Sequence, residues 1–160
     1  MKKTVLFILV AFVGMAACKK YEEGPFISFR SPEKRLCKTW YLKELTDQDN
    51  NSYDVNENTT ATFDKNGNVY IHYYNTPLQR YQTDTNQWRF VDNKKNVEIA
   101  SKTIQVTVDT LADSIAFHYE TVTVYDTIFI NRLTNKDFWF IWHDNHSPTK
   151  YFNYKYSSEK

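Results

Sequence analysis

Two polar stretches carry side chains that could hold a metal ion. In His143-Asp144-Asn145-His146, two imidazoles three residues apart could share one ion. A zinc site needs three or four ligands in a defined geometry, and no third ligand is clear, so a solvated turn is the favoured interpretation. Residues 47–57 carry oxygen donors at alternate positions, as a calcium loop does, but the sixth place lacks glycine and the twelfth is Asn58. A polar hairpin loop is favoured there, and no metal is predicted.

Signatures of catalysis are missing from the sequence. It contains no Gly-x-Ser-x-Gly nucleophile motif and no glycine-rich phosphate loop. With three glycines in the whole chain, such loops can hardly be built. Paired carboxylates cannot be identified from one sequence. We therefore expect a protein that is not an enzyme and uses no cofactor.

Cysteine is the other reactive residue, and the chain has two. Cys18 follows a positively charged start and the uncharged run Val5 to Ala17. As a helix that run reaches roughly 20 Å, whereas the hydrocarbon core of a bilayer is about 30 Å thick. Residues 1–17 therefore read as a secretory signal peptide. Cys37, between Leu36 and Lys38, is expected to be a small, partly buried hydrophobe.

The end of the signal peptide is more specific. Met15-Ala16-Ala17-Cys18 resembles the lipobox of bacterial lipoproteins, with methionine in the place of the usual leucine. The resemblance implies that the Cys18 thiol is diacylated as a thioether, that a peptidase cuts before it, and that the new amino end receives a further acyl chain such as palmitate. A membrane partner follows, because two or three chains anchor stably where one is marginal. The alternative is a plain cleaved signal peptide with an incidental cysteine.

The residues after Cys18 bear on localisation. Lys19 stands where inner-membrane retention would need aspartate, so lipid anchoring in the cell outer membrane is expected, facing the periplasm or the surface. Glu22-Glu23 faintly resembles a surface-export signal, and a solvated tether explains the same charges equally well. Gly24-Pro25 breaks any regular element, so residues 18–30 are predicted to be the acylated tether and residues 31–160 the folded domain.

Composition limits the partners and the size of the fold. Residues 1–17 remove two lysines from the 20 Lys and Arg against 19 Asp and Glu, which leaves a mature net charge of about −1. That balance gives no reason to expect nucleic acid as a partner. About 143 residues remain, which suits one domain. Aromatic residues make up 17% of the chain, and aromatic residues favour strands.

Alternation of apolar and polar residues runs through the mature chain. A helical turn capped by Ser31 precedes Lys38, and a hairpin follows around residues 64–67. We expect residues 75–87 to form a long polar loop and the strand of residues 121–133 to break or bulge near Asp126. No helix of useful length separates the eight to ten expected strands, so they are antiparallel. Such a set forms a sandwich or a barrel, and a barrel leaves no exposed edges.

The quoted segments also resemble a family. LCKTWYL, ATFDKNGNVY, QWRFVDNKKNVEIA and IFINRLTNKDFWFIW are similar to the lipocalin-like lipoproteins of Gram-negative bacteria. The resemblance implies an all-β, antiparallel up-and-down barrel in which Trp40 closes one end and Arg132 packs on it. Lys38 replaces the usual glycine two residues before the tryptophan, and the Thr-Asp-Tyr motif is missing.

A barrel of eight strands encloses room for packed side chains or one small ligand. The aromatic residues expected to face inward are candidate ligand contacts, although ordinary core packing is the favoured explanation for each of them: Phe63, Trp88, Phe90, Phe117, Phe140 and Trp142. The leading hypothesis is non-catalytic binding of a small hydrophobic or amphipathic molecule. The rival is a structural or interaction protein with a packed barrel, whose rim loops 46–58 and 75–87 contact an envelope protein or a glycan.

Overall fold

The structure, a computed structural model, describes residues 30–160 apart from 112–113, 145–146 and 148, and only the backbone of 108–111 and 114–117. The predicted signal peptide and Cys18 therefore lie outside the described residues. Within the described part no helix is long and apolar enough to cross a membrane.

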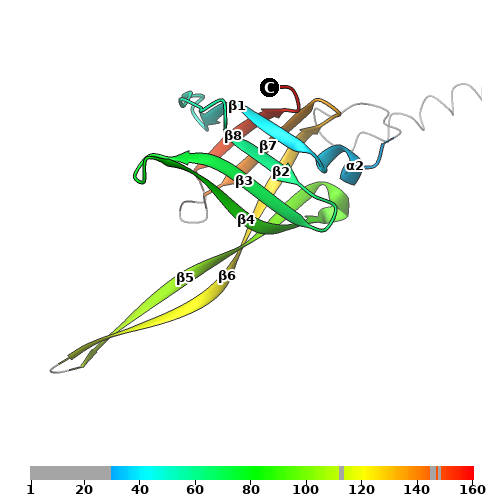
Figure 1. Ribbon diagram of the computed structural model, residues 1–160. Coiled ribbons are helices and arrows are strands. Elements are labelled where there is room, and N and C mark those ends of the chain that lie inside the picture. The colour runs from blue at the N-terminus through cyan, green and yellow to red at the C-terminus, as the bar shows by residue number, and fades with distance from the viewer. Residues whose placement is uncertain (1–29, 112–113, 145–146, 148) are drawn as a thin grey trace, which may run out of the picture.

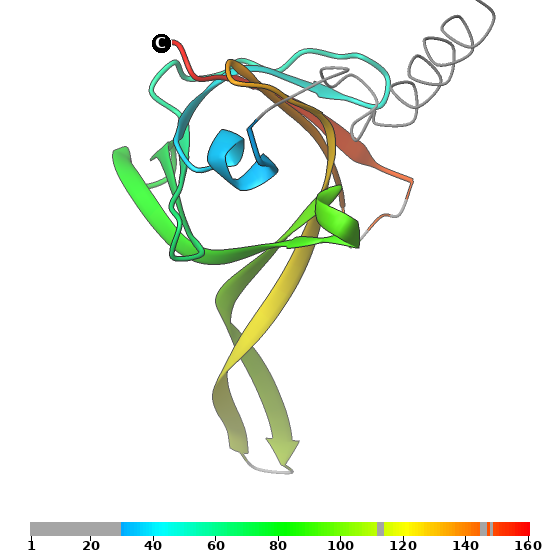
Figure 2. The same ribbon diagram turned by 90° about the vertical axis from the view of Figure 1, so that its right-hand side faces the viewer.

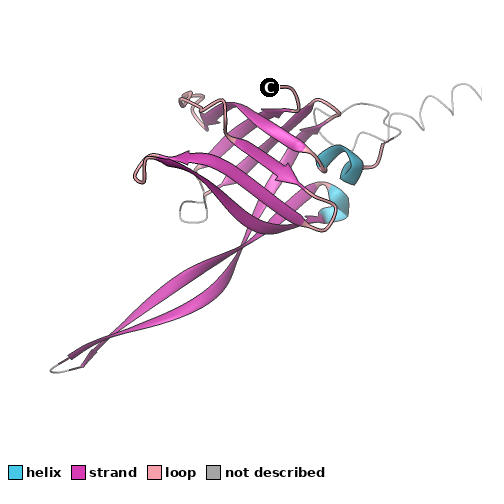
Figure 3. Ribbon diagram, viewed as in Figure 1, coloured by secondary structure: helices cyan, strands magenta, loops and turns pink. Residues whose placement is uncertain are grey.

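Eight antiparallel strands form a closed barrel in which each strand pairs with its neighbours in sequence and β1 pairs with β8 (Figures 1 and 3). This confirms the predicted all-β, up-and-down barrel. The strands are β1 (Thr39–Asp47), β2 (Thr60–Phe63), β3 (Asn68–Asn75), β4 (Arg80–Val91), β5 (Asn96–Leu111), β6 (Ser114–Leu133), β7 (Asp137–His143) and β8 (Tyr151–Ser157), with a 3-10 turn η1 (Asp92–Lys94) between β4 and β5.

A single turn of helix, α2 (Pro32–Leu36), lies across one end of the barrel (Figure 2). The Ser31 side chain accepts a hydrogen bond from the amide of Lys34 at 3.3 Å, and proline takes the first helical position, where its missing N–H costs nothing. The predicted capped turn is confirmed. Leu36 at its end is fully buried, so the helix acts as a plug for the barrel.

Side chains that alternate inward fill the barrel next to this plug. Trp40 on β1 pairs with Ala61 on β2, and Phe63 pairs with Val69 on β3; all four are buried. The rings of Trp40 and Phe63 both pack against Phe138 of β7, with centroids 5.5 and 5.7 Å apart. The core therefore lies at the end of the barrel that α2 closes.

The strands β5 and β6 continue far beyond the barrel as a two-stranded hairpin, which we call the arm (residues 101–127; Figures 1 and 2). The strand β5 pairs with β4 only from Asn96 to Ala100, and β6 pairs with β7 only from Ile128 onward. The predicted break near Asp126 is wrong, because β6 runs unbroken from Ser114 to Leu133 and its bulge lies between Ile130 and Arg132.

The stretch 75–87 also differs from the prediction. It was expected to be a rim loop, but β4 begins at Arg80 and pairs with β3 as far as Asn68 opposite Gln87. Only residues 76–79 form the turn. The polar side chains of residues 80–87 are typical of a loop. An antiparallel strand tolerates such side chains where one of its faces meets water.

Candidate functional site

The barrel has two unlike halves. Next to α2 most of the inward residues are buried, Leu133 and Phe138 completely, although Trp88 and Phe90 are only partly buried. The guanidinium of Arg35 donates to the Leu133 carbonyl at 2.7 Å, which ties α2 to β6. At the other end the inward side chains are only half-buried and pack against the edge of this core. Any small molecule bound inside the barrel has to enter the second half, which we call the open half.

Aromatic rings on β7 and β8 line one wall of the open half. Phe140 stacks on Tyr154 with centroids 4.9 Å apart, and Trp142 stacks on Phe152 at 6.0 Å. The register pairs the same residues directly across the two strands, so all four rings share the inward face. Burial raises the pKa of Tyr154, and its hydroxyl stays protonated at neutral pH. This row offers a flat apolar surface that is partly exposed.

The facing wall, formed by β3 and β4, is polar. The inward positions of β3 at Val69, Ile71 and Tyr73 pair with Asn86, Asp84 and Gln82 of β4, and directly opposed residues share a face. Partial burial, and then the carboxylate of Asp84, raise the pKa of Tyr73. A molecule in the open half would therefore meet aromatic rings on one side and carboxylate and amide groups on the other.

The arm leaves the barrel wall on the side of the open half. Within the described residues, positions 80–86 of β4 pair only with β3, because β5 leaves the wall at Ala100. The wall between β4 and β7 is thus incomplete on the side of the open half.

Most of the predicted ligand contacts lie in the barrel, although not all of them in the open half. Phe63 is buried in the core and meets Trp88 edge to face at 5.6 Å. Trp88 and Phe90 are half-buried, and the Trp88 indole donates to the Asp64 carbonyl at 3.1 Å. Phe140 and Trp142 belong to the aromatic row, and the prediction missed their partners Phe152 and Tyr154, although these alternate along β8 in the sequence.

Phe117 is the exception among the predicted contacts. Its backbone pairs with Val108 on the arm, well beyond the last pair that β5 makes with the barrel at Ala100. Residue 117 does not belong to the barrel wall, so the expectation that it lines the interior is wrong. Its side chain lies outside the described ones.

Trp40 and Arg132, the two residues that were expected to pack together and close the barrel, lie apart in the structure. Trp40 is fully buried beneath α2, and its indole Nε1 donates to the Leu36 carbonyl at 2.9 Å. Arg132 instead lies 4.8 Å from the ring centre of Trp139 and pairs with Asp137 at 3.1 Å. The expectation that it packs on Trp40 is wrong, because the bulge before Arg132 turns its side chain to the outer face.

The candidate metal ligands have other roles. Both carboxylate oxygens of Asp47 accept hydrogen bonds within the loop, from the amides of Asp49 and Asn51 and from the Asn51 side chain, each at 2.9 Å. The Asn51 side chain above all holds the pKa of Asp47 below its ordinary value. His143 is exposed beside Phe129, and His146 lies outside the described residues. Among the described side chains, no three His, Cys, Asp or Glu residues are grouped to hold an ion.

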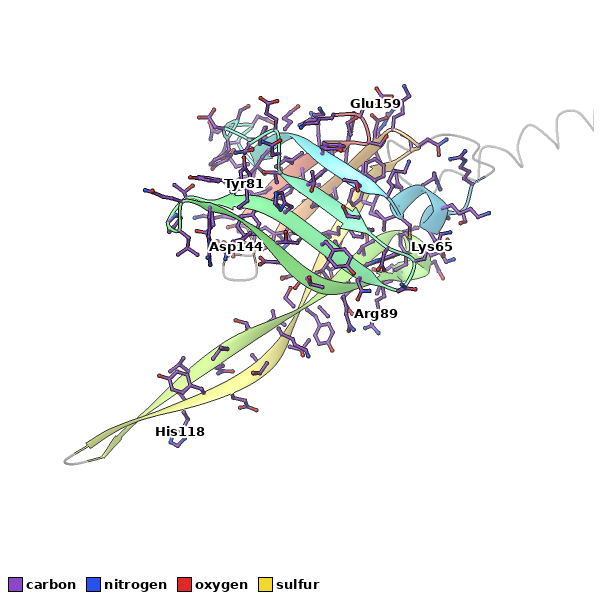
Figure 4. All side chains as sticks on the ribbon, viewed as in Figure 1. Lys65, Tyr81, Arg89, His118, Asp144 and Glu159 are labelled. Atoms are coloured by element: carbon purple, nitrogen blue, oxygen red, sulfur yellow. The ribbon has the colours of Figure 1, made fainter. Side chains whose placement is uncertain are left out.

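A second hollow lies outside the barrel, where the arm leaves it. This outer cleft has a volume of about 680 Å³ and is bounded by the β2–β3 turn, by β4 and by the base of the arm. Arg89 pairs with Glu98 across it at 2.6 Å (Figure 4 labels Arg89). Its remaining lining is rich in amides and includes one exposed aromatic ring: Asn66, Asn68, Gln87 and Tyr125.

Comparisons with known proteins give no further indication of function. No protein-family model matches the chain, and no curated protein matches its sequence significantly. Function has to be argued from the barrel and its side chains.

Proposed function

We propose that this protein is a cell-envelope lipoprotein whose barrel binds a small hydrophobic or amphipathic molecule in its open half, without catalysis. One observation carries the proposal: the fully buried inward residues lie towards α2, and the inward face ends in a row of only partly buried aromatic rings at the other end. Concave, mostly apolar surfaces with a few polar groups are the common form of small-molecule sites.

The chemistry of the two walls specifies the ligand class. An apolar chain or ring laid on Phe140 and Trp142 gains about 25 cal/mol for each Å² of apolar surface removed from water. The β4 wall presents Asp84 and the amides of Gln82 and Asn86, which accept hydrogen bonds or pair with a cation. We therefore expect an amphipathic molecule with a neutral or cationic polar group, and weaker binding of the corresponding anion.

The anchor rests on the sequence. Thioether acylation at Cys18 would hold the domain at the outer membrane through residues 18–30, facing the periplasm or the surface, where amphipathic molecules concentrate. In cells fed labelled palmitate, the wild-type protein is expected to carry label and to fractionate with membranes. The Cys18→Ser variant should lose both, and a variant that keeps them would refute the anchor.

Native mass spectrometry of the full-length protein, purified from its own host in mild detergent, tests the ligand. The expected spectrum contains a fraction with an added small-molecule mass that organic extraction removes. The Trp142→Ala variant should lose that fraction, whereas Trp139→Ala, which changes the outer face of the same strand, should keep it. A clean unliganded mass for the wild type would contradict the proposal.

An interaction protein with a packed barrel is the second candidate, and the outer cleft favours it. Planar amides, an ion pair and an exposed tyrosine are groups that hydrogen-bond and stack on sugars or on an extended peptide. If this is the function, Gln87→Ala or Tyr125→Ala would abolish binding of envelope glycan fragments, and Trp142→Ala would not.

A further inference from the structure

One row of side chains crosses four strands and forms the floor of the outer cleft. Asn68 pairs with Gln87, Gln87 with Ala100 and Ala100 with Tyr125, and directly opposed residues share a face. All four line the cleft, and the small side chain of Ala100 leaves the hollow between its two larger neighbours. Thr85, the next outward residue along β4, lines the cleft as well. The cleft is therefore continuous with the outer face of β3 and β4.

That outer face, which we call the β3–β4 face, carries no ion pair and no side chain that could form one with an acid. It consists of the even-numbered residues of β3 from Asn68 to Tyr74 and the odd-numbered residues of β4 from Tyr81 to Gln87, which oppose each other in the register. These described positions hold only Asn, Gln, His, Thr and Tyr, whereas Asp, Glu, Lys and Arg make up 24% of the chain. An exposed face of this composition is suited to a partner without charge.

The aromatic rings of the β3–β4 face are exposed, yet neighbouring side chains hold them in place. His72 stacks on Tyr81 with ring centroids 5.2 Å apart, and Tyr74 meets Tyr81 edge to face at the same distance. Asn58 donates to the Tyr81 hydroxyl at 3.1 Å, and the His72 ring and the Thr83 hydroxyl form a hydrogen bond at 2.9 Å. Tyr74 is still 39% exposed and Tyr81 45%. A ligand laid on rings that are already ordered loses little affinity to side-chain entropy.

These groups determine the class of ligand. Amides and hydroxyls donate and accept hydrogen bonds, as the hydroxyls of a sugar do, and the C–H groups of a sugar ring pack on the electron-rich face of an aromatic ring. Tyr70 and Tyr74 lie roughly 14 Å apart along β3, at about 3.4 Å per residue, so the face is long enough for several linked sugars. We infer that a neutral oligosaccharide chain binds in the outer cleft and continues along the β3–β4 face.

The charges around the cleft favour a neutral chain over an anionic one. Arg89 and Glu98 pair with each other, and among the described lining residues Lys102 alone adds a further charge. An acidic polysaccharide would therefore meet one such cation in the cleft and none along the β3–β4 face.

A glycan is also favoured over a protein or a membrane. Tyrosine is common in protein interfaces, but their centres are enriched in Arg, Met, Trp and Phe as well, and the described positions of the β3–β4 face hold none of these. Binding to an anionic membrane surface needs clustered Lys and Arg. The inference rests on the outer cleft of the second candidate function and uses no side chain of the open half.

An array of neutral and uronic-acid oligosaccharides of increasing length tests the ligand class. The full-length protein in mild detergent, detected through a C-terminal tag, is expected to bind neutral chains, and to bind them more strongly as they lengthen. Uronic-acid chains of the same length should bind more weakly. The inference would be overturned if no neutral chain binds, if acidic chains bind better, or if a single sugar binds as well as a chain.

Calorimetry with the longest neutral chain that binds separates the cleft from the β3–β4 face. Ala100→Trp, which fills the cleft, and Tyr74→Ala, which removes a ring far from it, should each weaken binding about tenfold. Trp139→Ala, on the outer face of β7, and Trp142→Ala, in the open half, should bind as the wild type does, and thermal unfolding checks that all four variants are folded.

The two substitutions also distinguish this inference from the second candidate function. If Tyr74→Ala keeps the wild-type affinity and Ala100→Trp loses it, the cleft binds the glycan but the continuation along the β3–β4 face is wrong. If Ala100→Trp keeps the wild-type affinity, both the inference and the candidate function of the cleft are wrong.

Discussion

The indole nitrogen of Trp40 donates to the carbonyl oxygen of Leu36, four residues earlier, at 2.9 Å. This bond joins the first strand of the barrel to the end of α2, and both residues are fully buried. The same carbonyl also accepts from the amide of Lys38 at 2.8 Å. The chain therefore folds back on itself within one short segment, and the plug is fixed to the wall that it closes.

Two substitutions of Trp40 measure separately how much its hydrogen bond and its packing contribute to the free energy of unfolding. Trp40→Phe removes the indole donor but leaves the Leu36 carbonyl bonded to Lys38, so we expect a loss of about 1 kcal/mol in the free energy of unfolding. Trp40→Ala also empties the space against Phe138 and should cost about 3–5 kcal/mol. Urea denaturation measures both values, and equal losses for the two variants would contradict this division.

Removal of most of the arm, residues 102–123, should leave the barrel intact. The residues of β5 that pair with β4 run from Asn96 to Ala100, and the residues of β6 that pair with β7 begin at Ile128. None of these residues is removed when residues 102–123 are replaced. Replacing residues 102–123 by Asn-Gly, which favours a tight hairpin turn, is therefore expected to shift the melting temperature by only a few degrees. Circular dichroism on heating checks this, and an unfolded product would show that the arm is needed for the barrel.

Acid should destabilise the fold through two similar loops. Asp64 accepts from the amides of Asn66 and Asn68, both at 2.8 Å, and from the Asn68 side chain at 3.0 Å, as Asp47 does in its own loop. The side chains of Asn51 and Asn68 are the main cause of the lowered pKa values of Asp47 and Asp64.

A lowered pKa in the folded state means that the unfolded chain binds more protons in acid, so stability rises with pH in that range. The two carboxylates make their full contribution to the free energy of unfolding above the pKa of the unfolded chain, about 3.9. This contribution disappears as the pH falls through the lower pKa values of the folded state. Unfolding free energies measured from about pH 6 to about pH 2.5 should therefore fall less steeply for Asp47→Asn/Asp64→Asn than for the wild type. Identical slopes would contradict the role of these two carboxylates.

Cys37 is expected to be an unreactive thiol. Partial burial, and then the charge of Asp64, raise its pKa, and its Sγ donates to the Asp64 carbonyl at 3.5 Å. Because the thiolate is the reactive form, Ellman's reagent should modify Cys37 slowly at about pH 7.4 and quickly in urea. The Cys18→Ser variant makes Cys37 the sole thiol for this measurement, and modification as fast in buffer as in urea would contradict the prediction.

Residue patterns alone predict the antiparallel strands and the capped turn before β1, whereas the barrel and its closed end were implied by the family resemblance. Strict alternation in ATFDKNGNVY marks the β2–β3 hairpin, whose turn contains Gly67 at a φ of +85°, a left-handed conformation that suits glycine. Ser31 and Pro32 mark the start of α2. These features are local, so neighbouring residue types are enough to determine them.

The arm could not be predicted in the same way. Residues 103–108 and 115–119 alternate as well as any strand inside the barrel, because alternation reports which face a residue occupies and not whether a third strand lies alongside. The wrong placement of Phe117 follows from this. Arg132 illustrates the second difficulty: simple alternation from Ile130 places it inward, and one bulge reverses its face. Bulges depend on pairing between strands and leave no clear mark in either strand alone.

The most direct test of ligand binding compares two tryptophans on β7. Trp142 faces inward beside Phe152, whereas Trp139 faces outward under Arg132 and Lys155. Titration with N-phenyl-1-naphthylamine, an apolar fluorescent amine, should show saturable binding by the wild type and by Trp139→Ala. Trp142→Ala should bind about tenfold more weakly, a loss of about 1.4 kcal/mol. Equal affinities for the two variants, or no saturable binding by the wild type, would contradict a ligand site in the open half of the barrel.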